Sequence, residues 1–136
     1  MAFEAVIVEL LGNGGDPVEY TVADGTTIAK GTVMELEDPR TMKKVSGAGV
    51  VIAGIAASEK LANDGSVKLA VYTNGIFDLT VDTGATATLG SYVRSNAATN
   101  EVTVATTLDN ETGKAIGKAL ETGAADEVIQ VAVGVY

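Results

Sequence analysis

The sequence predicts a mainly β protein, folded as a small single-domain β-barrel or β-sandwich of a tulip-like kind, with at most short helical turns. Apolar and polar residues alternate through most of residues 67–81, VKLAVYTNGIFDLTV, and such alternation is typical of half-buried strands. Hydrophobic residues make up 46% of the chain but aromatic residues only 4%. The core is therefore built from Val, Ile, Leu and Ala, a mixture that suits packed strands joined by short turns.

The dipeptide Asn74-Gly75 divides this stretch into two alternating halves. Both residues tolerate a positive φ, so the dipeptide between two such runs predicts a hairpin with a type I′ turn. One long strand with a glycine bulge at the same place is the alternative. Either interpretation makes the stretch part of a sheet.

Turn-forming Gly, Pro, Asn and Asp residues separate the remaining expected elements along the chain. Strands are expected at residues 3–11, 18–22, 50–57, 101–106 and 128–136. A helical turn is expected at residues 58–63, and residues 109–113 are expected to form a turn. The segment GNGGDP at 12–17 predicts a loop. The chain is therefore divided into residues 1–16, an N-terminal arm or first strand with its glycine-rich loop, and a β domain of residues 17–136.

The two halves of the chain resemble one another. IAKGTVMEL at 28–36 aligns with ATLGSYVRS at 87–95, which places Gly31 opposite Gly90. Further along, GIA at 54–56 aligns with GKA at 117–119, and KLAV at 68–71 with QVAV at 130–133. A duplication predicts a pseudo-symmetric β fold within one domain. Chance self-alignment of a chain rich in Val, Gly and Ala is the other explanation, and the sequence leaves both open.

Charge and composition exclude several classes of function. A net charge of −9 opposes direct binding to nucleic acid or to an anionic membrane. The chain has no His and no Cys, so it lacks the usual zinc ligands, thiolate nucleophiles and imidazole bases. Asp78 and Asp82 are the carboxylates closest to a catalytic pair, but acids in β turns more often serve the turn itself. We expect no catalytic residue, no metal site and no cofactor.

The N-terminus also predicts no export signal or membrane span. Glu4 and Glu9 stand where a signal peptide needs positive charge and an unbroken apolar run. No segment approaches the length of uninterrupted apolar sequence that a membrane-spanning helix needs.

Four segments together resemble a known family: GIAAS at 54–58, VKLAVYTNGIFDL at 67–79, LGSYV at 89–93 and AIGKALE at 115–121. They are similar to strands of the small head-decoration, or capsid-cement, proteins of tailed phages. The resemblance implies a homotrimer on the outer surface of an icosahedral virion. There it would hold neighbouring subunits of the major capsid protein together against internal DNA pressure. It implies no active site, and a tail, fibre or baseplate component is the alternative.

The acidic, apolar N-terminal segment is the candidate for a partner contact. An arm that precedes a glycine-rich loop is able to pair with the sheet edge of another protein. On this hypothesis residues 2–11 bind the capsid lattice, with Phe3, Val6 and Val8 as apolar anchors. The alternative is that residues 3–10 form the first strand of the protein's own sheet.

Overall fold

The structure of the chain is a computed structural model that describes residues 3–9 and 17–134. These residues form strands and one short helix, so the predicted mainly β class is confirmed. The elements are β1 Val6–Glu9, β2 Val18–Thr21, β3 Val33–Asp38, β4 Thr41–Lys44, β5 Ile52–Ala56, β6 Lys68–Tyr72, β7 Gly75–Thr80, β8 Tyr92–Ser95, β9 Val102–Val104, α1 Thr107–Glu111, β10 Ala115–Ala119 and β11 Val128–Val133. The loop predicted at 12–17 lies outside the described residues except for Pro17. The division at residue 16 therefore stays a prediction.

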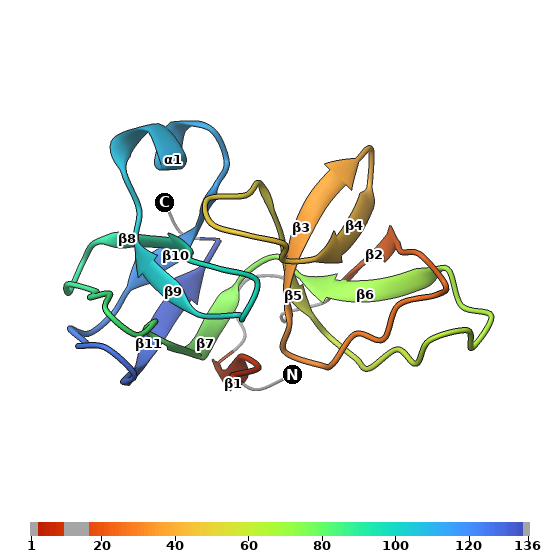
Figure 1. The fold of residues 1–136 in the computed structure, drawn as a ribbon, viewed down its shortest axis with the longest axis horizontal. Coiled ribbons are helices and arrows are strands. Elements are labelled where there is room, and N and C mark those ends of the chain that lie inside the picture. The colour runs from red at the N-terminus through yellow and green to blue at the C-terminus, as the bar shows by residue number, and fades with distance from the viewer. Residues whose placement is uncertain (1–2, 10–16, 135–136) are drawn as a thin grey trace.

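The strands form two bodies that lie side by side (Figure 1). The first half of the chain makes a closed barrel with the strand order β2-β4-β3-β5-β6. The second half makes a six-stranded sheet with the order β1-β7-β11-β10-β8-β9. β1 is therefore the one strand in the described sheet that comes from the beginning of the chain, and it forms an edge.

The strand pairing of the first half is repeated in the second half. The neighbours β4-β3-β5-β6-β2 correspond in sequence order to β9-β8-β10-β11-β7. A parallel pairing of Thr21 with Thr41 closes the barrel, and a parallel bridge of Val81 with Val102 lies at the corresponding place in the second half. The structure thus confirms the predicted pseudo-duplication at the level of topology.

The aligned glycines Gly31 and Gly90 show how closely the repeats agree. Both have a positive φ, 90° and 84°. Each N–H donates to the carbonyl of the aligned alanine, Ala56 or Ala119, over 2.9 Å. The same backbone turn is therefore built twice, and glycine relieves its steric cost.

The predicted hairpin at Asn74-Gly75 is wrong. β6 pairs with β2 and β5, whereas β7 pairs with β1 and β11. The dipeptide is the junction between the two repeats, where the chain leaves the barrel and enters the sheet. β6 obtains its backbone partners in the barrel and β7 in the six-stranded sheet, and these long-range pairings outweigh the local turn preference.

The helical turn expected at residues 58–63 is also wrong. That segment contains an antiparallel bridge of Lys60 with Ile28 and then a turn at residues 62–63. The short helix α1 overlaps the turn expected at residues 109–113. Its start is fixed by a capping box in which Thr106 Oγ1 accepts from the Asp109 N–H and the Asp109 carboxylate accepts from the Thr106 N–H.

The two repeats share one hydrophobic cluster. It combines Val33, Val45 and Ile55 of the barrel with buried side chains of the second repeat such as Phe77 and Leu79. A separate cluster that includes Met34, Met42 and Val71 fills the barrel. Packing across the repeat boundary explains how two small units hold together. In the described residues, no helix is long and apolar enough to cross a membrane.

Candidate partner-binding surface

The ionisable side chain most deeply buried in the barrel is that of Lys60, which is 1% exposed. Its ammonium donates to the carbonyl oxygens of Asp24 (2.7 Å) and Leu61 (3.1 Å) and to the Asp64 carboxylate (3.0 Å), and it also pairs with the Asp24 carboxylate. Burial lowers the pKa of Lys60, but the hydrogen bonds and charges of Asp64 and Asp24 outweigh it and raise the pKa. A protonated, fully bonded ammonium ties two loops together and is no nucleophile.

An acidic cluster lies where the second repeat closes. Burial is the main cause that raises the pKa of Glu101, and the neighbouring carboxylates of Asp82 and Asp126 raise it further. Asp82 accepts a hydrogen bond from the Asn96 amide. Among the described residues no group of three or more acidic, His or Cys side chains is arranged to hold a metal ion. The candidate catalytic acid Asp82 therefore serves a loop contact.

Asn100 connects the second repeat to the barrel and to the N-terminal segment. Its side chain is buried, its Oδ1 accepts from the Val33 N–H at 2.5 Å, and its Nδ2 donates to the carbonyls of Phe3 (2.8 Å) and Gly31 (3.1 Å). Its φ of 71° is one that Asn adopts more readily than most residues. The residues next to Asn100 in the sequence carry no signal of partners 67 or more residues away, so its role could not be predicted from the sequence.

The N-terminal segment that Asn100 holds is placed as a strand of the protein's own sheet. β1 runs antiparallel to β7, with Val6 opposite Asp78 and Ile7 opposite Phe77. The alternative interpretation of residues 3–10, an intramolecular first strand, thus describes the arrangement in this chain.

Two of the three predicted anchors, Val6 and Val8, lie in β1 and Phe3 precedes it, and all three remain accessible. Phe3 is 45% exposed, Val6 58% and Val8 45%. Three large, exposed apolar side chains within residues 3–9 form the kind of surface that a partner protein often covers. Ile7 between them points the other way and packs against the shared core.

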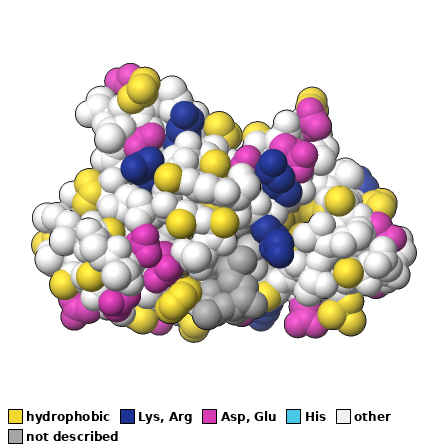
Figure 2. Space-filling view, viewed as in Figure 1, with side chains coloured by type: hydrophobic (Ala, Val, Ile, Leu, Met, Phe, Trp, Pro, Cys, Tyr) yellow, Lys and Arg dark blue, Asp and Glu magenta, His cyan; other side chains and the backbone are white. Residues whose placement is uncertain are grey.

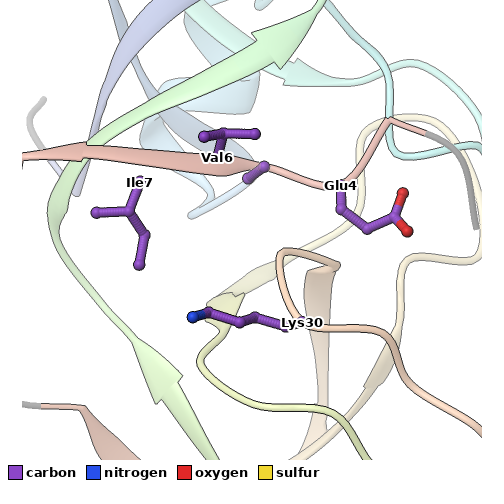
Figure 3. A pocket seen from close by; sticks show the side chains of 5 residues that line it. Glu4, Val6, Ile7 and Lys30 are labelled. Carbon is purple, nitrogen blue, oxygen red and sulfur yellow. The ribbon is translucent and has the colours of Figure 1, made fainter.

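A groove of about 410 Å³ runs beside β1. Figure 3 shows its lining side chains: Ile7 points from β1 toward the Lys30 side chain, while Glu4 lies farther along. Lys30 comes from the turn before β3, so the groove lies between the N-terminal strand and the first repeat. Sequence reasoning did not find Lys30, which carries no motif of its own.

A second surface feature is the hollow between two projections in Figure 2. Dark blue Lys and Arg side chains lie on both sides of it. Among the described cations, Lys43 pairs with Glu35 at 3.7 Å and Arg94 with Asp109 at 3.5 Å. Such internal pairing neutralises part of the positive charge, and the β1 edge with its groove is the stronger candidate for binding.

Comparison with known proteins identifies the family. A sequence model of the phage cement proteins matches residues 13–135. The chain belongs to the phage cement protein family. The cement protein is therefore a structural component of a virion, as the resemblance in the sequence predicted. The match begins after β1, so Phe3, Val6 and Val8 lie outside the matched segment.

A solved structure supports the fold of the cement protein. The crystal structure of the head fiber gp8.5 N base of bacteriophage phi29 superimposes with a TM-score of 0.54 and 8% sequence identity, covering 86% of this chain and 93% of that chain. At this identity the likeness shows a shared fold. The comparison with curated protein sequences finds no match.

Proposed function

We propose that this cement protein binds the outside of an icosahedral phage head as homotrimers and stabilises the lattice of the major capsid protein. Membership of the cement family over residues 13–135 is the observation that carries the proposal. In this role the protein contributes binding energy and acts without catalysis.

The surface of the monomer supports assembly with other chains. Several large apolar side chains outside β1 are more than half exposed: Leu61, Val67, Leu89, Leu108 and Val128. Contacts between copies and with the capsid would remove such side chains from water, which is favourable by roughly 25 cal/mol for each Å² of apolar area. The oligomer is tested directly by light scattering, in which a monomer at high concentration would contradict the trimer.

The proposed capsid contact uses Phe3, Val6 and Val8. Their exposure and their position on a sheet edge support this role, because edge strands readily accept partners. The deciding experiment mixes the protein with undecorated heads of its own phage and images them by cryo-microscopy. Density at three-fold positions is expected, and density at the tail or at a unique vertex would favour a tail, fibre or baseplate role.

A substitution series then assigns the contact to these residues. The triple variant Phe3→Ser, Val6→Ser, Val8→Ser removes apolar contact area and should lower occupancy on heads by at least about tenfold. The control Leu36→Ser, Val51→Ser, Leu120→Ser changes three exposed apolar side chains that lie outside β1 and outside the set assigned to contacts with other chains. Equal loss of head binding in both variants would contradict a specific role for the N-terminal anchors.

A further inference from the structure

The direction of the backbone groups on β7 shows which edge of β1 is open. Successive residues of a strand present their N–H and C=O to opposite edges. The N–H of Val81, at the end of β7, donates to the Glu127 carbonyl on the β11 side. By this alternation Phe77 also faces β11, and Asp78 faces β1.

The register of β1 against β7 then fixes the orientation of β1 itself. Val6 lies opposite Asp78 and Ile7 opposite Phe77. Val6 is therefore the residue that exchanges backbone hydrogen bonds with β7. The N–H and C=O of Ile7 point away from the sheet, toward its outer edge.

A neighbouring hydrogen bond agrees with this orientation. The N–H of Ala5, two residues before Ile7, donates to the carbonyl of Gly31 at 2.6 Å, on the side of the turn that contributes Lys30. The outer backbone groups of Ile7 thus lie along the groove that Ala5, Ile7 and Lys30 line (Figure 3). In the described part of the chain no residue outside the strands bonds to these groups.

The groove combines two recognition elements. One is a backbone donor and acceptor at Ile7, spaced for one residue of an added strand. The other is the exposed ammonium of Lys30, which forms no ion pair with a described residue. Glu4 also lines the groove, but its carboxylate lies farther from Ile7 than the Lys30 ammonium does (Figure 3). A cation beside an open strand edge favours an extended segment that carries a carboxylate.

We infer that an extended, carboxylate-bearing loop of the major capsid protein adds to the outer edge of β1, its backbone pairing with Ile7 and its carboxylate binding Lys30. This inference rests on the proposed function and assigns β1 the role of acceptor of a capsid strand. A second copy of β1 fits less well. The bond from Ala5 to Gly31 already closes the edge there, so a full-length antiparallel neighbour would meet the turn at residues 29–31.

The test uses Ile7→Pro on the full chain, measured by co-sedimentation with undecorated heads. Proline is tolerated on an edge strand when its missing N–H faces outward, so pairing with β7 stays intact. Loss of the outer donor together with the obstruction by the ring should weaken head binding by roughly tenfold or more. Ile7→Ala is the control, because it loses more of the side chain but keeps the N–H, and it should bind more tightly than Ile7→Pro.

Charge is tested separately with Lys30→Glu and the matched control Lys68→Glu, a similarly exposed lysine on β6. Only Lys30→Glu should weaken binding, and the difference should shrink as salt is raised. Hydrogen exchange on the wild-type protein needs no variant. The Ile7 amide should exchange faster than that of Val6 in the free protein and become protected on heads.

The possible results separate the two proposals. If the wild-type protein fails to bind heads, the proposed function itself fails. If it binds and Ile7→Pro binds equally well, or the Ile7 amide stays unprotected on heads, strand addition is wrong while the function stands. If Ile7→Pro changes the solution mass and leaves head binding intact, the edge receives another copy of this chain and the capsid assignment is overturned.

Discussion

The side-chain oxygen of Asn100 accepts a hydrogen bond from the backbone N–H of Val33 at 2.5 Å, across 67 residues of sequence. The same side chain donates to the carbonyls of Phe3 and Gly31. One buried amide thus joins the second repeat, β3 of the barrel and the N-terminal segment. The position of β1, and with it the proposed capsid contact, depends on this residue.

Replacing Asn100 with Ala should therefore destabilise the fold by about 2–4 kcal/mol. The change leaves the buried Val33 N–H without its partner, at a cost of roughly 1–3 kcal/mol, and places Ala at a positive φ that Asn adopts more readily. Urea denaturation measures the loss. Asn63→Ala is the control, since Asn63 has a φ of 60° but is exposed. Equal losses in both variants would assign the effect to backbone strain alone.

Much of the fold could be predicted because alternation and glycine spacing are local signals. The strands at 50–57 and 128–136 correspond to β5 and β11, and the aligned glycines mark the repeat. The Asn74-Gly75 turn was mispredicted because pairing partners lie outside the local window. Strand order depends on which strand, often distant in the sequence, provides the backbone hydrogen-bond partners of each strand. A single dipeptide does not determine that partner.

The repeat makes a prediction about two aligned glycines. A β-carbon on Gly54 would overlap the Tyr72 carbonyl, and one on Gly117 the Ala132 carbonyl. Gly54→Ala and Gly117→Ala should each cost about 1–3 kcal/mol or more, because the obstructing atoms belong to backbone. The free energy of unfolding from urea titration measures both. Gly47→Ala, where a β-carbon meets nothing within 4 Å, should be nearly neutral.

Glu101 should make the stability of the protein depend on pH. Burial first, and then Asp82 and Asp126, raise its pKa in the folded state above the ordinary value of 4.5. The folded protein therefore binds a proton more tightly than the unfolded chain, and the free energy of unfolding falls as pH rises from about 4.5 through the folded pKa. Glu101→Gln should abolish this fall, as urea midpoints across that range would show. An unchanged pH profile in the variant would contradict the assignment.

The candidate surface was only partly predictable from the sequence. Phe3, Val6 and Val8 stood out because apolar residues in an acidic segment are visible without a structure. Lys30 and Asn100 did not, because their roles come from the turn and the loop that the repeat boundary brings to β1. Contacts that cross between repeats depend on packing, which a single sequence does not display.

Lys60 gives a second loss of stability with rising pH, at the alkaline end. Burial alone would lower its pKa, but hydrogen bonds and charges from Asp64 and Asp24 raise it above the ordinary value of 10.5. Its contribution to stability is fully present below the unfolded pKa and is lost as pH rises through the folded pKa. Lys60→Met keeps the length of the side chain but removes the ammonium that donates to the Asp24 and Leu61 carbonyls and leaves the two carboxylates of Asp24 and Asp64 without their cation. The variant should have a lower urea midpoint at neutral pH and a flatter alkaline profile. Lys68→Met, on the exposed side of β6, is the control and should retain both the midpoint and the profile of the wild-type protein.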